Sequence, residues 1–214
     1  MHVVITGASR GIGAGLAALY KDAGNDVTGT GRSVASDIQL DVTRPSDHAA
    51  MADALADRPI DLLVCNAGVY FDKQENLNDG YGAEMWAATF AANVTGVFLS
   101  IQHMLPMLRM AQSPKIAIIS SQMASSTHAP GGSYMYRASK AAVLNLGRNL
   151  ATDLKPEGIA VGIYHPGWVQ TDMGGSTADI GVDASVQGLA LRFDALNIAS
   201  TGCFETWDGR THAY

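Results

Sequence analysis

A strand, a glycine-rich turn and a helix follow one another directly at the start of this sequence, and this order restricts the folds open to the chain. Residues 2–6 are largely apolar and β-branched, as in a buried strand. They are followed by the turn Gly7-Ala8-Ser9-Arg10-Gly11-Ile12-Gly13 and then by residues 14–21, which are rich in helix formers. Glycines let the backbone approach a pyrophosphate, and a helix N-terminus offers N–H groups to its charge. The segment predicts a nucleotide-binding loop, although alone it would also suit an ordinary glycine-bearing loop.

The rest of the chain alternates between strands and helices in the same way. Further strands are expected at residues 26–30, 38–40, 61–65, 115–120, 159–164 and 203–205, and further helices at residues 46–56, 81–110, 134–154 and 183–196. Pro106 is expected to bend or break the long helix 81–110 near its end. Apolar strands separated by helices indicate a parallel sheet covered on both faces. We therefore predict an α/β fold in which residues 1–214 form a single domain, a doubly wound parallel sheet of the Rossmann type.

Composition and charge exclude several other classes of protein. The 214 residues are 47% hydrophobic and 16% charged, and a chain of this length buries roughly 70% of its unfolded surface in one core. A net charge of -6 argues against nucleic acid or an anionic membrane surface as a partner. We expect a cytoplasmic protein, because neither a secretion signal nor a long apolar span is visible. Cys65 and Cys203 lack metal-ligand spacing and are expected to be free thiols, and no metal site is expected.

Small or polar residues follow four of the predicted strands. These segments are Asp41-Val42, Asn66-Ala67-Gly68, Ser120-Ser121 and His165-Pro166-Gly167. Each of them alone would also suit a turn or a helix cap. In parallel sheets, however, ligands bind beyond the carboxyl ends of the strands, so the four segments are expected to converge on one cleft.

Tyr136 and Lys140 are four residues apart in a segment expected to be helical, which places their side chains on one face about one turn apart. A phenol ordinarily titrates near ~10. A neighbouring ammonium lowers this pKa and suits the phenol to donate and accept protons near neutral pH. The spacing alone also arises by chance on solvated helices, so the glycine turn is what makes a catalytic pair the favoured interpretation.

Taken in order, these motifs resemble the short-chain dehydrogenase/reductase family from residue 2 to about residue 173. The resemblance is carried by the glycine turn, Asn66-Ala67-Gly68, Asn93, Ser121, Tyr136-x-x-x-Lys140 and Pro166-Gly167. Residues 136–140, 165–175 and 204–209 further resemble the branch of C-factor and sniffer-like carbonyl reductases.

The resemblance implies a catalytic set of four residues. Tyr136 would be the acid/base that passes a proton to the carbonyl oxygen as hydride arrives from the nicotinamide. Lys140 would lower the pKa of Tyr136 and hold the nicotinamide ribose. Ser121 would hydrogen-bond the substrate oxygen, and Asn93 would steady a water linking Lys140 to solvent. These roles agree with the chemistry, because hydride transfer leaves an alkoxide that needs a donor and a proton. Asn93 also has a simpler interpretation as a polar residue within a helix.

The same resemblance, together with the residues at the strand ends, implies the cofactor contacts. The expected cofactor-binding residues are Gly7, Ser9, Arg10, Gly11, Ile12, Gly13, Arg32, Asp41, Val42, Asn66, Ala67, Gly68, Tyr136, Lys140, Pro166, Gly167, Val169 and Thr171.

Two departures from the family pattern affect the substrate side. Ser121 precedes Tyr136 by fifteen positions, about two more than the commonest pattern, and counting back by that pattern reaches Met123, which cannot act as a donor. We prefer Ser121 over Ser120, Ser125 and Ser126 because it directly follows the apolar strand; a longer loop costs little entropy. The loop after Thr171 is short and rich in small residues, so an open cleft is expected. Its candidate walls are Met123, Tyr134, Trp168 and Met173, although such residues are as often core.

The end of the second strand predicts the cofactor preference. An acidic residue there accepts hydrogen bonds from the ribose of NAD and repels the 2′-phosphate of NADP. Here Gly31 and Arg32 occupy this place, Arg10 is a second cation nearby, and Asp37 lies too far past the strand to be the first choice for a ribose ligand. Because arginine binds phosphate with two parallel bonds, we predict NADPH over NADH. The alternative is that both arginines are solvated surface charges.

The leading function is therefore an NADP(H)-dependent oxidoreductase that acts on a small-molecule ketone, aldehyde or secondary alcohol. The alternative is a nucleotide-binding signalling or regulatory protein of the same fold with incidental turnover. The complete set of Asn93, Ser121, Tyr136 and Lys140 favours the enzyme, because a binding module does not need all four. The family resemblance also implies a homodimer or homotetramer formed through the helices expected at residues 81–110 and 134–154.

Overall fold

The structure is a computed structural model that describes residues 1–214. Its centre is a seven-stranded sheet with the strand order β3-β2-β1-β4-β5-β6-β7, and every pairing between neighbours is parallel. The strands are β1 (His2–Ile5), β2 (Asp26–Gly31), β3 (Ile38–Gln39), β4 (Leu62–Cys65), β5 (Lys115–Ile119), β6 (Ala160–His165) and β7 (Phe204–Thr206). This architecture confirms the predicted Rossmann-type fold.

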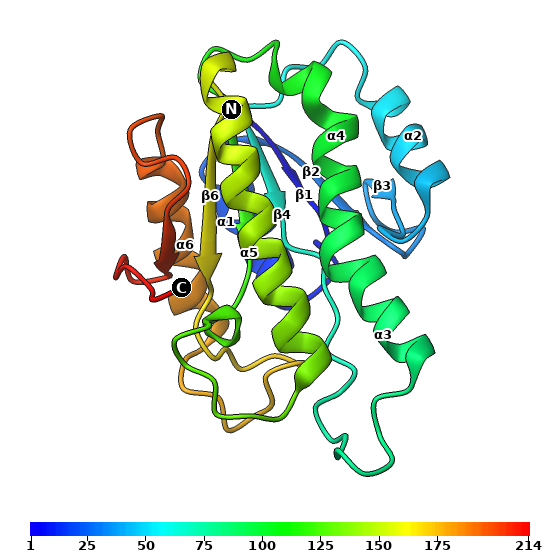
Figure 1. Ribbon diagram of the computed structural model, residues 1–214. Coiled ribbons are helices and arrows are strands. Elements are labelled where there is room, and N and C mark those ends of the chain that lie inside the picture. Colours follow the sequence, from blue (N-terminus) through cyan, green and yellow to red (C-terminus); the bar gives the residue numbers. More distant parts are fainter.

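Helices cover both faces of the sheet (Figure 1). They are α1 (Gly11–Asp22), α2 (Pro45–Ala54), α3 (Ala83–Phe90), α4 (Gly96–Leu108), α5 (Tyr134–Leu154) and α6 (Val182–Ala195), with short turns η1 (Ala91–Thr95), η2 (Gln122–Ala124) and η3 (Lys155–Glu157). Helices α1 and α6 pack on one face, whereas α2, α4 and α5 pack on the other. None of the helices combines the length and the apolar character that crossing a membrane requires.

The strands divide the core into two layers, because successive side chains of a strand point to opposite faces. Val3 and Ile5 of β1 belong to the cluster under α1 and α6, whereas Val4 belongs to the cluster on the other face. Gly147 lets α5 approach the sheet closely, since a Cβ at this position would lie 2.7 Å from Cγ1 of Ile163. Helix α5 is therefore seated directly on β5 and β6.

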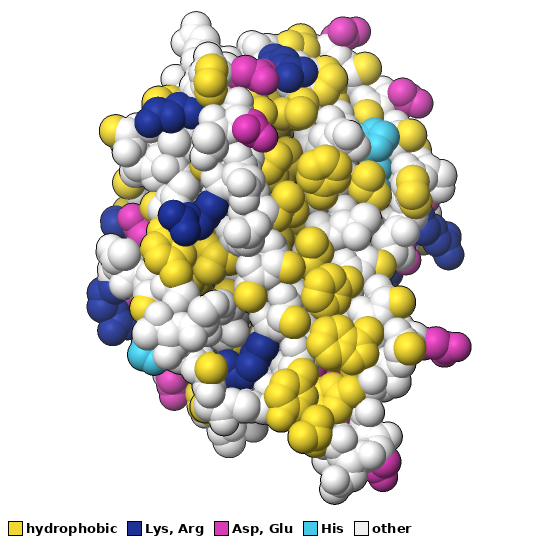
Figure 2. Space-filling view, in the orientation of Figure 1, with side chains coloured by type: hydrophobic (Ala, Val, Ile, Leu, Met, Phe, Trp, Pro, Cys, Tyr) yellow, Lys and Arg dark blue, Asp and Glu magenta, His cyan; other side chains and the backbone are white.

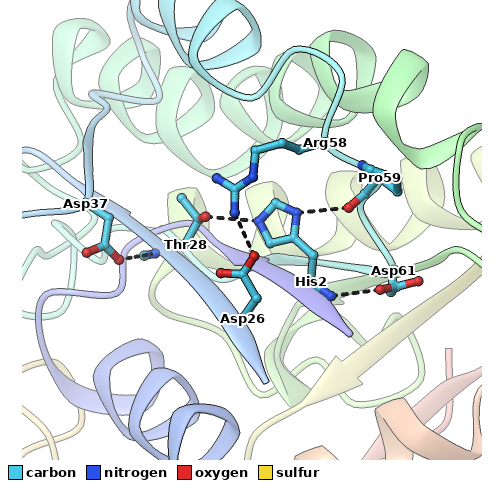
Figure 3. Close-up of polar contacts among 8 residues, drawn as sticks. His2, Asp26, Thr28, Asp37, Arg58, Pro59 and Asp61 are labelled. Atoms are coloured by element: carbon cyan, nitrogen blue, oxygen red, sulfur yellow. Dashed lines mark hydrogen bonds and ion pairs between the residues drawn. The ribbon is translucent and has the colours of Figure 1, made fainter. Parts of the chain in front are cut away.

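Polar contacts fasten the amino ends of β1 and β2 to the segment before β4 (Figure 3). The backbone N–H of His2 donates to Asp61 at 2.7 Å, and its ring bridges the carbonyl of Pro59 at 2.9 Å and the hydroxyl of Thr28 at 3.0 Å. These contacts lie at the edge opposite the carboxyl ends and fix the relative register of the three strands.

The segment expected as one helix over residues 81–110 is divided by a turn of π-helix. Helix α3 runs into η1, where Asn93 lies, and α4 then continues to Leu108. Pro106 lies inside α4, which ends two residues later, so the main irregularity is the π-turn rather than the expected proline break. A π-turn adds a residue to the helical repeat and is frequent at functional sites. Here it directs Asn93 inward.

The order of the strands reverses between β1 and β4. From β1 the chain builds outward through β2 and β3, then crosses back to β4 and continues to β7. In doubly wound sheets, the crevice at such a reversal, beyond the carboxyl ends of the strands, is where ligands bind. The glycine turn after β1 and the loop after β4 meet at this crevice.

Candidate active site

Tyr136 and Lys140 lie one turn apart on α5 and both are buried, with only 8% of Tyr136 and 5% of Lys140 exposed. The ammonium of Lys140 donates to the carbonyl of Ile119 at 2.9 Å, where β5 ends. The same nitrogen lies 5.6 Å from the centroid of the Tyr136 ring. The spacing therefore produces the expected pairing at the carboxyl edge of the sheet.

Burial acts on the two groups in opposite directions. It raises the pKa of the Tyr136 phenol well above its ordinary value, while a hydrogen bond with Ser121 lowers that pKa by less. Burial also lowers the pKa of Lys140 to about 8. The expectation that Lys140 lowers the pKa of Tyr136 is not met in this structure. Loss of solvent around the phenol outweighs the hydrogen bond with Ser121, Tyr70 and Asp72 raise the pKa further, and the ammonium is directed to Ile119.

Among the candidate serines, the structure brings Ser121 to Tyr136. Ser121 follows β5, its hydroxyl accepts from the backbone N–H of Met123 at 3.1 Å, and it shares a hydrogen bond with the phenol. Ser120 instead donates to the carbonyl of Lys140 at 3.0 Å, and Ser125 donates to the carbonyl of Tyr214 at 3.2 Å. This geometry agrees with the register chosen from the sequence.

Asn93 is fully buried and ties the π-turn to the loop after β4. Its amide donates to the carbonyl of Val69 at 2.9 Å and to the hydroxyl of Ser139 at 3.0 Å, and its Oδ1 accepts from the N–H of Val69 at 2.8 Å. A Cβ on Gly68 would lie 3.1 Å from that oxygen and 3.6 Å from Nζ of Lys140. Asn93 and Lys140 therefore meet at Gly68, and one acceptor position of Oδ1 remains for a bridging group.

The glycine turn forms a cradle in which added side chains have no room. Gly7 has a φ of +70°, and a Cβ there would lie 2.9 Å from the backbone of Ala67. A Cβ on Gly13 would collide with the carbonyl of Gly7, and Asn66 closes the turn by donating to the carbonyls of Thr6 and Gly7, each at 3.1 Å. No side chain caps the start of α1, so its first N–H groups are open to an anion. These features fit the pyrophosphate of a dinucleotide.

Arg10 and Arg32 lie at the rim of this cradle. Arg10 forms an ion pair with Asp172 at 2.9 Å, and both side chains are more than two-thirds exposed, at 72% and 76%. Arg32 has no side-chain partner; its carbonyl accepts from Gln39 at 3.1 Å. Both guanidinium groups remain accessible to a ligand.

Asp37 lies closer to the cofactor side than the sequence suggested. Its carboxylate folds back to accept from the N–H of Gly29 at 2.8 Å, as Figure 3 shows, and lies 3.7 Å from the ammonium of Lys21. It lines a cavity of about 330 Å³ with Ser9, Ser33 and other residues. The β2–β3 loop brings Asp37 back, which position along the strand alone did not reveal.

The remaining predicted cofactor residues lie on the neighbouring loops. The carbonyl of Val42 accepts from the ring of His48 at 2.9 Å, and Asp41 accepts from the N–H of Thr43 at 3.0 Å. On the other side, a Cβ on Gly11 would lie 3.3 Å from the methyl group of Thr171. Ile12 belongs to the first turn of α1, and Pro166, Gly167 and Val169 form the loop that leads from β6 to Thr171. The structure thus brings the loops after β1, β4 and β6 together.

Two residues of the site were not singled out by sequence analysis. The ring of Tyr70 stacks on that of Tyr136 with a centroid distance of 4.2 Å. Asp72, only 1% exposed, accepts from the N–H groups of Met135 at 2.8 Å and Tyr136 at 3.3 Å. Both contacts join positions more than sixty residues apart, so no local pattern reveals them. Three of the candidate substrate walls are partly exposed, namely Tyr134 at the start of α5 and Trp168 and Met173 in the segment after β6.

Comparison with known proteins identifies the family. The sequence model of the short chain dehydrogenase family matches residues 1–179. The chain belongs to this family. C-signal of Myxococcus xanthus is 40% identical to this short-chain dehydrogenase over 161 residues, which cover 75% of this chain and 96% of that protein.

Solved structures agree with this membership. The NADPH-bound carbonyl reductase from chicken fatty liver superposes with a TM-score of 0.90 at 29% identity, covering 100% of this short-chain dehydrogenase and 98% of that chain. Carbonyl reductase Sniffer of D. melanogaster has a TM-score of 0.91 at 24% identity, covering 100% and 99%, and shows the shared fold. The predicted family and the resemblance to C-factor and sniffer-like proteins are confirmed.

Proposed function

We propose that this protein is an NADP(H)-dependent oxidoreductase that transfers hydride between the nicotinamide and a small-molecule carbonyl or secondary alcohol. The observation that carries the proposal is a buried phenol, Tyr136, that contacts Ser121 and lies near Lys140, whose ammonium in turn lies beside Gly68 of the loop after β4. Family membership supports oxidoreductase chemistry. The burial of Tyr136 beside Lys140 supports Tyr136 as the acid/base.

The cofactor, when bound, would supply or accept the hydride, and side chains of the protein would donate or accept the proton. Because its pKa is raised, Tyr136 stays protonated at neutral pH and can donate to a carbonyl oxygen that gains negative charge. Ser121 orients the phenol and offers a second hydrogen bond to the same oxygen. Lys140 would hold the nicotinamide ribose. Together with Asn93, which it meets at Gly68, it would form the route by which a proton is returned to the phenol.

We propose a preference for NADPH over NADH. Arg10 and Arg32 are both exposed to a ligand, and the residues at the end of β2, Gly31 and Arg32, are not acidic. The carboxylate of Asp37 lies against β2, and it is engaged by the N–H of Gly29 and the ammonium of Lys21. The related carbonyl reductase from chicken fatty liver contains NADPH, which supports NADP binding.

The competing hypothesis of a purely regulatory nucleotide-binding protein is less well supported. A protein that only binds a nucleotide does not need the complete set of proposed catalytic side chains.

We further propose a cytoplasmic homodimer or homotetramer. Apolar side chains gather on the face of α4 and α5 seen in Figure 2, and Phe98 of α4 is partly exposed there.

A panel of ketones, aldehydes and secondary alcohols, assayed by nicotinamide absorbance with NADPH and NADH, tests the proposal. The wild-type protein should turn over at least one class of carbonyl, and it should turn over faster and bind the cofactor more tightly with NADPH than with NADH.

Tyr136→Phe removes only a hydroxyl, so the folded variant should lose at least ~100-fold in turnover. Lys140→Ala should lower both turnover and cofactor affinity. Near-normal turnover of folded Tyr136→Phe would show that the acid is misassigned.

A further inference from the structure

The ring of Tyr70 covers the catalytic phenol. The Tyr70 and Tyr136 rings are 4.2 Å apart between centroids and nearly parallel, with an angle of 20° between their planes. The Tyr70 hydroxyl is fixed at its other end by a hydrogen bond of 2.6 Å to Ser133. A ring held by stacking and by its hydroxyl has little freedom to move. Tyr70 itself is only partly buried, so its ring is the more exposed of the two stacked rings.

The segment that carries Tyr70 is anchored on both sides. Before it, the N–H and the carbonyl of Val69 both bind the side chain of Asn93. After it, the buried carboxylate of Asp72 binds the first N–H groups of α5, including that of Tyr136. Residues 69–72 therefore connect the π-turn to the start of the catalytic helix.

The backbone of Ser133, the hydrogen-bond partner of Tyr70, is held in an unfavourable conformation. It occupies the N-cap of α5 with a φ of +48°, a left-handed conformation that is unfavourable for a residue other than glycine. A serine at an N-cap ordinarily accepts from the helix N–H groups. Here Ser133 makes no such cap; its hydroxyl binds Tyr70, while Asp72 caps the helix from another loop.

We propose that Tyr70 is a positioning residue for proton transfer: its ring holds the phenol of Tyr136 toward Ser121 and shields one face of it from water. The inference rests on the proposed function, because it assumes that Tyr136 is the acid. A misplacement of about 1 Å at a reacting group can cost ~100-fold in rate, so a fixed ring has a kinetic consequence.

Three variants and one control test the proposal by kinetics. Tyr70→Ala removes the ring and should lower kcat for carbonyl reduction by about 10- to 100-fold while leaving the KM for NADPH within about twofold. Tyr70→Leu should act in the same direction, and it provides the test if the alanine variant does not fold. Tyr70→Phe keeps the stacked ring and should stay within about threefold of wild type. Tyr81→Ala is the control, because Tyr81 pairs edge-on with Tyr134 and does not touch Tyr136.

A second readout does not depend on turnover. Burial raises the pKa of Tyr136, and the neighbouring Tyr70 phenol adds to this. Removing the Tyr70 ring admits water, so Tyr136 should ionise at lower pH in Tyr70→Ala than in wild type. Titration of phenolate absorbance measures this, with Tyr136→Phe and the double variant Tyr70→Ala/Tyr136→Phe subtracted to isolate the Tyr136 signal. The alkaline limb of the kcat profile should move in the same direction.

The outcomes separate the two proposals. Unchanged kcat and unchanged Tyr136 titration in Tyr70→Ala and Tyr70→Leu would overturn the positioning role, as would a loss no greater than that of Tyr81→Ala. An active wild type whose Tyr136→Phe variant is equally active would instead overturn the assignment of the acid. Ionisation of Tyr136 at a lower pH in Tyr70→Ala, together with a decrease in kcat and a nearly unchanged KM for NADPH, would support the inference.

Discussion

Tyr136 and Lys140 show how one environment acts on two titratable side chains with opposite results. Loss of solvent disfavours the charged form of each, so the pKa of the phenol rises and that of the ammonium falls to about 8. Near neutral pH the phenol is therefore a proton donor, while Lys140 is close to exchanging its own proton. Burial therefore moves apart the proton affinities of two groups whose ordinary pKa values are close, 10.0 for the phenol and 10.5 for the ammonium.

At the same scale, the serine proposed to bind the substrate oxygen, Ser121, can be distinguished from its neighbours by substitution. Ser121→Ala should lower kcat by roughly 100-fold or more, because it removes a donor to the developing oxyanion and the partner of Tyr136. Ser125→Ala should be close to neutral for kcat, since Ser125 binds the carbonyl of Tyr214 instead. Steady-state reduction of the best carbonyl in the panel measures both. If Ser125→Ala lowered kcat more than Ser121→Ala did, the donor would be Ser125 in the lengthened loop rather than Ser121.

At the scale of the element, the sequence predicts the seven strands and most helices, because their apolar periodicity is a local property. The segment over residues 81–110 also reads as helical, but the one-residue register change at Asn93 leaves no trace in composition. The same limit explains why Tyr70 and Asp72 were not singled out. Their partners, Tyr136 and the start of α5, are distant in sequence, and only the completed sheet brings them together.

The end of β2 determines a prediction about cofactor choice. Arg32→Asp replaces the cation proposed to bind the 2′-phosphate of NADP by a carboxylate, so the ratio of NADPH to NADH affinity should fall by at least ~10-fold. Fluorescence titration of both cofactors gives the ratio. Lys155→Asp makes the same charge change in η3, before the amino end of β6, and should leave the ratio unchanged. Tighter binding of NADH than NADPH by the wild-type protein would contradict the predicted preference.

At the scale of the whole molecule, buried histidines make folding depend on pH. Burial is the main cause that lowers the pKa of His165 to about 4; nearby His212 and Arg210 lower it further, and Asp208 opposes them. The unfolded chain would bind this proton near ~6.5. Between these values the unfolded state carries more protons, so stability is complete above the higher pKa and is lost as the pH falls through this window.

Urea unfolding at pH 7 and pH 5 tests this dependence. The His165 contribution to the free energy of unfolding should fall by about 2 kcal/mol between the two conditions, from the linkage relation. His165→Gln removes the titrating ring and should reduce the pH dependence by that amount. His128→Gln removes an exposed histidine and is the matched control. An unchanged pH dependence in His165→Gln would show that His165 does not determine it.

The two ends of the sheet have a consequence for the behaviour of the protein at high concentration. An exposed edge strand is a template on which other chains can add and aggregate. Here the edge strand β3 has only two residues, and β7 has three. The outer edge of β7 is also occupied, because the N–H of His212 donates to the carbonyl of Phe204 at 2.9 Å. Self-association by strand addition therefore has almost no starting point in the folded state, and contacts between copies depend on side chains rather than on backbone.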